Sequence, residues 1–227
     1  MTVEQNLRTV NEKIRQSCEK SGRSPEDVTV IAVTKYVSEK RAQEAVDAGI
    51  LHLAENRKEG LLKKQLEIRD ERVTWHLIGT LQSRKVKDVV ERIDYLHSLD
   101  RLSLAEEINK RLHHGKLKCF VQANISGEET KHGLEEDKLE PFIREMERFE
   151  HIEVVGLMTM APNTEDERVI RQVFRRLKEL RDRIRDRHLS YAPCTELSMG
   201  MSHDYPIAIE EGATFVRIGT ALVGKEE

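Results

Sequence analysis

The sequence lacks most of the features that mark exported, membrane-bound or nucleic-acid-binding proteins. It has only three cysteines in 227 residues, and Cys18, Cys119 and Cys194 lie too far apart for a disulfide framework or a clustered zinc site. No stretch approaches the ~18 consecutive apolar residues of a membrane span, and no apolar segment opens the chain as an export signal would. With 38 Lys and Arg against 41 Asp and Glu, a net charge of −3, it also lacks the basic excess that binds nucleic acid. We therefore expect a cytoplasmic protein with neither a membrane nor a nucleic-acid partner.

Length and apolar content are sufficient for one folded unit. At ~100–200 residues per domain, 227 residues predict one domain or at most two small ones. The hydrophobic fraction of 38% supports a sizeable core, and no low-complexity linker divides the chain. We predict a single domain over residues 1–227.

Helix and strand patterns alternate along the whole chain. Apolar residues at spacings of three and four from Val3 to Cys18 predict a first helix that ends at Gly22. The β-branched run 28–35 then predicts a strand buried on both faces. Further strands are predicted to end near residue 56 and to cover residues 74–79, 95–98, 119–125, 154–160, 197–199 and 215–218, with helices between them, one of them capped by Ser83.

About eight strand–helix units match the count of a TIM (β/α)8 barrel. The competing fold, a doubly wound open sheet that binds a dinucleotide, needs a G-x-G-x-x-G turn after its first strand. Residues 34–37 read Thr-Lys-Tyr-Val and do not form such a turn. The pattern therefore favours the barrel.

Mostly polar residues close the predicted strands. In a barrel, the C-terminal strand ends meet at one mouth, where functional groups lie. We therefore expect the strand-end side chains to converge there. These residues, in order, are Lys35, Asn56, His76, Ser98, Asn124, Met158, Ser198 and Arg217.

Lys35 carries the clearest chemistry of this set. An ammonium group at the end of a buried strand would be partly withdrawn from water, which favours the free amine that attacks an aldehyde. The other interpretation is a lysine that extends from the barrel rim into solvent. A reactive amine here would serve either an aldolase or a protein that holds pyridoxal phosphate as a Schiff base. Only the second needs a permanent phosphate site and a partner for a ring nitrogen.

Candidates for both groups lie near the C-terminus. Gly219 and Thr220 follow the last predicted strand, where backbone N–H groups and a hydroxyl bind phosphate in many barrels. Ser202 follows the seventh strand and adds another hydroxyl. Arg217 lies on the strand beside the first, within reach of a pyridine nitrogen. Because arginine keeps its proton, it would leave that nitrogen unprotonated and weaken the ring as an electron sink.

Taken together, these segments resemble the pyridoxal phosphate homeostasis protein family, whose fold is similar to the N-terminal barrel of alanine racemase. The matching segments are residues 32–35, 55–56, 75–79, 81–83, 97–101, 122–133, 156–160, 197–204 and 216–221. The resemblance implies an α/β fold, a TIM (β/α)8 barrel of the alanine racemase N-terminal type with an extra N-terminal helix. It also implies pyridoxal phosphate held as a Schiff base on Lys35, and a role in buffering or delivering this cofactor without established turnover.

From the pattern and the resemblance we predict eight cofactor-binding residues: Lys35, Asn56, His76, Ser198, Ser202, Arg217, Gly219 and Thr220. We predict no catalytic residue and no metal site. The expected partners are pyridoxal phosphate and pyridoxal-dependent apo-enzymes, with the protein a monomer or weak dimer.

Rival patterns have simpler explanations. Ser202, His203 and Asp204 are consecutive and cannot form the relay of a catalytic triad. The nine histidines form no H-E-x-x-H pattern. The arginines of residues 175–187 alternate with acids, which indicates a solvated helix face, with RNA binding as a minor alternative.

An amino-acid racemase is the alternative function. Racemases of this barrel type carry a C-terminal β domain and need a second acid/base group opposite the lysine. The sequence ends seven residues after Thr220, so we expect no such domain. Tyr36, Tyr95, Tyr191 and Tyr205 are candidate bases, and no pattern favours one of them.

Overall fold

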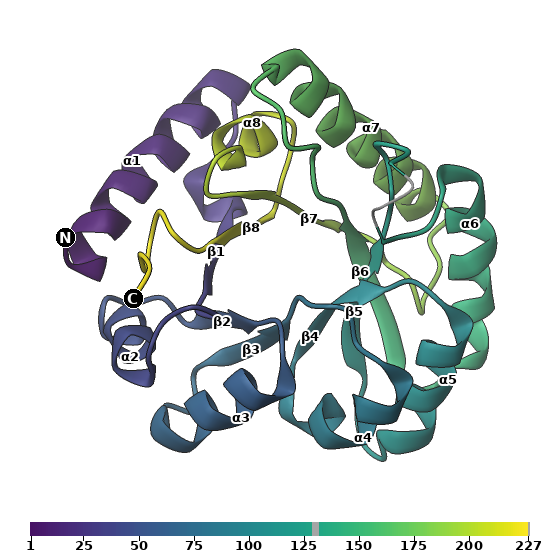
Figure 1. Cartoon of the computed structure of the whole chain (residues 1–227). Coiled ribbons are helices and arrows are strands. Elements are labelled where there is room, and N and C mark those ends of the chain that lie inside the picture. The colour runs from purple at the N-terminus through teal and green to yellow at the C-terminus, as the bar shows by residue number, and fades with distance from the viewer. Residues whose placement is uncertain (129–131, 227) are drawn as a thin grey trace.

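Eight parallel strands close into a barrel in the computed structural model of the chain, which describes residues 1–128 and 132–226 (Figure 1). Each strand pairs with the next along the chain, and the last pairs with the first. The strands are β1 Thr29–Val33, β2 His52–Glu55, β3 Thr74–Leu77, β4 Tyr95–Leu99, β5 Leu117–Gln122, β6 Ile152–Met158, β7 Glu196–Met201 and β8 Phe215–Ile218. This order confirms the predicted (β/α)8 barrel.

Helices surround the barrel, as Figure 1 shows. They are α1 Val3–Ser21, α2 Glu39–Asp47, α3 Lys58–Glu67, α4 Val86–Val89, α5 Leu102–Arg111, α6 Glu136–Glu145, α7 Glu167–Arg185 and α8 Tyr205–Glu210. None of the described helices is long and apolar enough to cross a bilayer.

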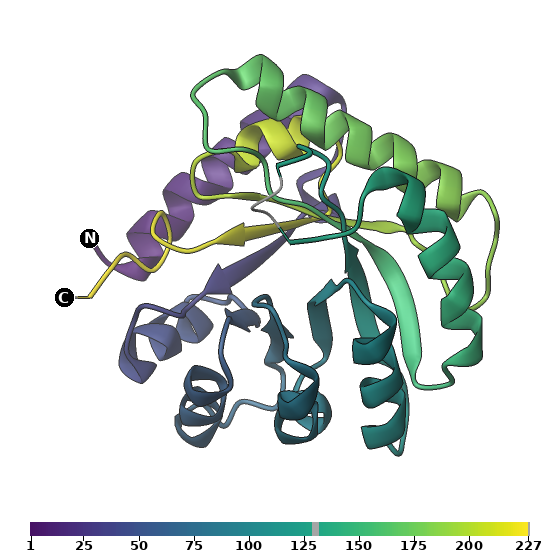
Figure 2. The ribbon, with the colours of Figure 1, turned by 45° about the vertical axis from the view of Figure 1, so that its right-hand side comes forward.

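The predicted extra N-terminal helix is α1. A capping box at Thr2 starts it, and Gly22 ends it with a φ of 67°, a left-handed conformation that glycine adopts without steric cost. Its buried stripe includes Val3, Val10 and Ile14. Figures 1 and 2 show α1 beside α8, with the two chain termini close together. The helix therefore covers the junction of the last and first strands.

Successive side chains of each strand point alternately toward the helices and into the barrel, which divides the core into two layers. Ala32, Val216 and Ile218 belong to the layer between the strands and the helices. Ile31, Val33 and Phe215 belong to the smaller layer inside the barrel. Because side chains alternate along a strand, Arg217 shares the interior face of β8 with Phe215. A charged group is thus placed inside the barrel by the same pattern that packs the core.

Three local expectations were wrong. The helix predicted after Ser83 is broken into two 3-10 turns and the four-residue α4, and Ser83 makes no capping hydrogen bond. Several strands are shorter than predicted: β1 ends at Val33, and β3 ends before Gly79. Arg181, expected on the solvated face of α7, is only 7% exposed and donates to the Thr195 carbonyl. Of the family-like segment 122–133, residues 129–131 lie outside the described residues.

Candidate functional site

A cavity of about 400 Å³ opens at the C-terminal ends of the strands. Six of the eight predicted site residues line it: Lys35, Asn56, Ser202, Arg217, Gly219 and Thr220. They come from the ends of β1, β2, β7 and β8, segments far apart in the sequence that barrel closure brings together. The structure thus gathers most of the predicted set around one space.

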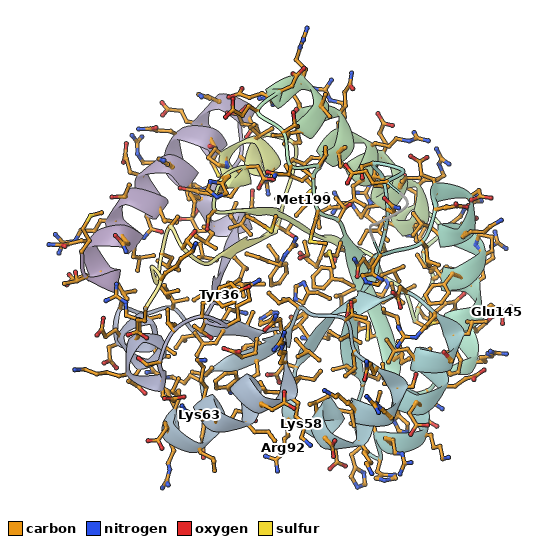
Figure 3. All side chains as sticks on the ribbon, in the orientation of Figure 1. Tyr36, Lys58, Lys63, Arg92, Glu145 and Met199 are labelled. Atoms are coloured by element: carbon orange, nitrogen blue, oxygen red, sulfur yellow. The ribbon has the colours of Figure 1, made fainter. Side chains whose placement is uncertain are left out.

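Lys35 lies at the rim of this cavity and is exposed. The expectation of a partly buried amine was wrong, because β1 ends at Val33, two residues before the lysine. Its Nζ lies 4.8 Å from the ring centroid of Tyr36, which is 62% exposed. Figure 3 shows Tyr36 within the ring of helices, whereas Lys63 and Glu145 extend from its periphery. The amine is accessible to a ligand without any rearrangement of the core.

A buried ion pair fixes the strand ends that carry Lys35 and Asn56. Glu55 ends β2, and its Oε1 accepts a 2.6 Å hydrogen bond from the Thr34 hydroxyl beside β1. The same oxygen lies 2.9 Å from Nζ of Lys64 on α3, and both side chains are at most 5% exposed. Such a pair holds its partners in one geometry, since neither charge can be left alone in the interior.

Close backbone packing also shapes the floor of the cavity. A side chain on Gly79, which follows β3, would place its Cβ only 2.2 Å from the carbonyl oxygen of Asn56. Glycine is therefore required where the loops after β2 and β3 meet.

The loops after β7 and β8 form a cradle around one oxygen. Backbone N–H groups of Gly219 and Ala221 both donate to Oγ of Ser202, at 3.2 and 3.3 Å. The turn that presents Ser202 is fixed by Asp204, whose carboxylate accepts a 2.6 Å hydrogen bond from the Met201 N–H. Two N–H groups and a hydroxyl that converge on one point are the donor set that binds a phosphate oxygen.

Arg217 forms part of the cavity wall and is only 4% exposed. Its Nη1 donates to Oγ of Ser198 at 2.6 Å, and its Nη2 donates to the Thr159 carbonyl at 3.0 Å. Burial lowers the pKa of Arg217 to about 10, against the opposing attraction of the Asp204 carboxylate. The group therefore stays charged at neutral pH. Two of its five N–H donors bond to groups in the described part of the chain, and the guanidinium can also donate to a ligand.

Ser198 and His76 do not line the cavity; they lie beneath it, inside the barrel. Ser198 Oγ lies 2.8 Å from Nδ1 of His97. His97 Nε2 lies 2.9 Å from His76 Nδ1, and His76 Nε2 lies 2.9 Å from Nδ1 of His52. These groups form a continuous polar chain that ends at Arg217. The structure thus places the predicted pair behind the arginine rather than against a ligand.

The two innermost histidines are neutral. His76 and His97 are completely buried, and this burial is the main reason that the pKa of each lies well below its ordinary range. Neighbouring charge adds to the effect: His52 acts on His76, and His76 and Arg217 act on His97.

Several cavity residues are not among the eight cofactor-binding residues predicted from the sequence. They are Tyr36, Gln122, His132, Met160, Met201 and His203. Met160 and Met201 are among the few exposed large hydrophobic residues of the described chain. Met160 is the last residue of the strand predicted over 154–160, and Met201 lies two residues beyond the strand predicted over 197–199. A search at and just beyond each predicted strand end would have found both. Gln122 ends β5, and Tyr36, His132 and His203 lie in loops whose path no periodic pattern specifies.

Chemically, the cavity combines an accessible primary amine, a cradle for an anionic oxygen and a buried guanidinium. An amine of this kind attacks an aldehyde carbon. The cradle and the guanidinium suit a ligand with a phosphate at one position and a hydrogen-bond acceptor at another.

Comparison with known proteins gives a consistent result over the full chain. The family model described as the alanine racemase N-terminal domain matches residues 4–227. A pyridoxal phosphate homeostasis protein of Aquifex aeolicus is 38% identical over 229 residues, with both chains covered completely.

Solved structures give the same picture. The structure of PipY from Synechococcus elongatus with pyridoxal phosphate bound has a TM-score of 0.84 and 30% identity, covering 98% of this chain and all of that one. An alanine racemase of Clostridium difficile has a TM-score of 0.76 at 15% identity, covering 96% of this chain and 56% of that one. At that identity the racemase likeness concerns the fold alone.

Proposed function

The chain belongs to the pyridoxal phosphate homeostasis protein family, and from this membership we propose that it binds pyridoxal phosphate and buffers or delivers it to other proteins. The cofactor occupies the cavity at the C-terminal mouth and is held as a Schiff base on Lys35. The observation that carries this proposal is the convergence of Lys35, the Ser202 cradle and Arg217 on one cavity of about 400 Å³.

The cavity residues fit this ligand by their chemistry. The N–H groups of Gly219 and Ala221 now share the Ser202 oxygen, and a phosphate oxygen is the stronger acceptor for the same donors. Thr220 adds a hydroxyl beside them, and Asn56 lies on the wall. When bound, the cofactor supplies an aldehyde for covalent attachment.

Arg217 contributes a donor that does not lose its proton near neutral pH. Facing a pyridine nitrogen, it donates a hydrogen bond and leaves that nitrogen without a proton of its own. A ring in this state is a poor electron sink, so binding is favoured over carbanion chemistry. His76 and Ser198 act behind Arg217 and hold it in place.

We extend the proposal to the organisation of the protein. Residues 1–227 act as one pyridoxal phosphate-binding domain in the cytoplasm, as a monomer or weak dimer. The recipients of the cofactor are pyridoxal-dependent apo-enzymes. The full-length match to the relatives supports the single domain.

The proposal treats the protein as a carrier rather than an enzyme. Among the described residues, Tyr36 is the only tyrosine that lines the cavity, and it stands next to Lys35 in the sequence rather than across from it. Two bases on opposite faces of the substrate are what racemisation needs. The cavity therefore favours retention over turnover.

An absorption spectrum of purified protein mixed with pyridoxal phosphate tests the proposal. We expect an imine band that borohydride converts to a stable adduct, and tryptic mass spectrometry should place the adduct on Lys35. Lys35→Ala should abolish the band and keep the melting temperature of the apo protein, because the Lys35 side chain is exposed and its removal opens no core cavity. An adduct on Lys40, Lys58 or Lys85 instead would refute the assignment.

A further inference from the structure

We propose that a hydrogen-bond chain positions Arg217 and runs from it through Ser198, His97, His76 and His52. The hydrogens of this chain all point away from Arg217, and a proton taken up by His52 reverses them. The inference rests on the proposed function, because Arg217 matters here as the group that holds the cofactor ring. It assigns a role to an interior polar chain that the binding site does not explain by itself.

The direction of the chain follows from the arginine. A guanidinium can only donate, so Ser198 Oγ must accept from Arg217 at 2.6 Å. Ser198 Oγ has two hydrogen-bond partners among the described residues, and Arg217 cannot accept, so the buried hydroxyl hydrogen is paired only if it is donated to His97 Nδ1, 2.8 Å away. His97 therefore carries its hydrogen on Nε2 and donates to His76.

The donor and acceptor of each remaining bond follow in turn, as far as His52. His76 accepts at Nδ1 from His97 and donates from Nε2 to Nδ1 of His52, each at 2.9 Å. Each of the three neutral rings thus carries one hydrogen, on Nε2, and every hydrogen points away from Arg217. In this arrangement each bond of the chain has one donor and one acceptor, as buried polar groups require.

Packing holds the rings in this alignment. The His76 ring stacks on Tyr95 with centroids 4.6 Å apart and an interplanar angle of 7°. The His97 ring stacks on Phe120 at 4.4 Å and 25°. The rings cannot turn freely, so a change at one end is transmitted as a change of tautomer rather than absorbed by rotation.

His52 is the end of the chain that solvent reaches. It is the first residue of β2, only partly buried, and lines a cavity of about 330 Å³ at the N-terminal end of the barrel. The titratable and charged groups that face it or share its cavity are His76, Tyr95, Asp94, Lys118, Glu91, His114 and Lys116. Burial lowers the pKa of His52, Asp94 raises it and Lys118 lowers it. Uptake of a proton therefore belongs to mildly acidic conditions.

A second hydrogen on His52 must sit on Nδ1, which then can no longer accept from His76. The chain restores its bonds when His76 and His97 carry their hydrogens on Nδ1 instead of Nε2. One proton is gained in all: His52 holds two N–H groups, each other ring still holds one, and Ser198 keeps its hydroxyl hydrogen. Ser198 Oγ now accepts from both His97 and Arg217, and its own hydrogen loses His97 Nδ1 as its acceptor. The hold of Ser198 on Arg217 therefore weakens.

Nitrogen-15 NMR of the histidine side chains tests the direction without any cofactor. At about pH 8 we expect all three rings of the chain to carry hydrogen on Nε2. On acidification through the titration of His52, the His97 hydrogen should move to Nδ1 in the wild type. In His52→Asn, whose amide oxygen accepts from His76 but does not titrate, it should stay on Nε2. A His97 hydrogen on Nδ1 at pH 8, or no tautomer change as His52 titrates, would overturn the proposal.

Cofactor affinity tests the consequence for the site. Between about pH 8 and about pH 5, the dissociation constant of pyridoxal phosphate should rise in the wild type by a factor roughly tenfold larger than in His52→Asn. A tenfold change is the lower end of what a hydrogen bond to a charged group contributes to affinity. His114→Asn, an exposed histidine of the same cavity, should behave like the wild type. Equal pH profiles for the wild type and His52→Asn would overturn the proposal. Should His52→Asn not fold, His52→Gln replaces it.

The two levels fail separately. If the wild type shows no binding of pyridoxal phosphate at pH 8, the proposed function fails. The tautomer measurement still decides the direction of the chain in that case.

Discussion

Acid should destabilise this protein through two interior histidines, His76 and His97. Both rings are fully buried, both are hydrogen-bonded on each nitrogen, and burial keeps the pKa of each well below its ordinary value. The unfolded chain has no such constraint, and its histidines take up protons near pH 6.5. Lowering the pH therefore favours the unfolded state.

The sign and size follow from proton binding. Because the pKa is lower in the folded state, the stability is complete above about pH 6.5 and is lost as the pH falls below it. One proton bound only by the unfolded state costs about 1.4 kcal/mol per pH unit. Two histidines should therefore remove about 2.8 kcal/mol by about pH 5.5, a substantial part of the ~5–15 kcal/mol that stabilises a typical domain.

Urea unfolding followed by circular dichroism at several pH values between about 5.5 and 7.5 measures this slope. His97→Asn should lower stability at pH 7.5 yet roughly halve the pH dependence, because one titrating group is gone. His113→Asn, in an exposed histidine, should change neither. If the wild type keeps the same stability from pH 7.5 to 5.5, folding does not lower the pKa of the interior histidines and this explanation is refuted.

Four further predictions concern the pair beneath the site, the ligand groups and turnover. Lys64→Ala should cost about 3 kcal/mol in chemical denaturation because Glu55 is left buried without its cation, whereas Lys63→Ala, in an exposed pair, should leave the midpoint unchanged. Arg217→Gln should raise the dissociation constant of pyridoxal phosphate roughly tenfold or more, measured by titration of the imine band; Arg168→Gln, whose side chain is 90% exposed, should not, and equal effects would contradict the assigned site. Ser202→Ala should weaken binding of pyridoxal phosphate but not of pyridoxal, since the cradle is proposed to hold the phosphate, which pyridoxal lacks. A chiral assay with alanine should show no racemisation; turnover of ~1 per second or faster would make the protein an enzyme.

The order of elements was readable from the sequence because each unit repeats the same local rule. Buried parallel strands are short, apolar and β-branched, and amphipathic helices show spacings of three and four. Gly22 marks a helix end by its own chemistry, and the structure places it at the end of α1. Even the site at one mouth followed, since the chain direction of parallel strands brings their ends together.

What the sequence could not determine depends on contacts between distant segments. Lys35 is exposed because β1 ends at Val33, two residues before it. No local pattern specifies the residue at which a strand leaves the barrel. His76 and Ser198 were identified as polar strand-end residues, but only barrel closure shows that they face inward and reach Arg217 through His97. The Glu55–Lys64 pair likewise joins a strand to a helix that the sequence does not show in contact. Local periodicity determined the elements, and the tertiary structure decided which polar groups line the cavity and which bond to each other, because burial and hydrogen-bond partners are properties of the closed barrel.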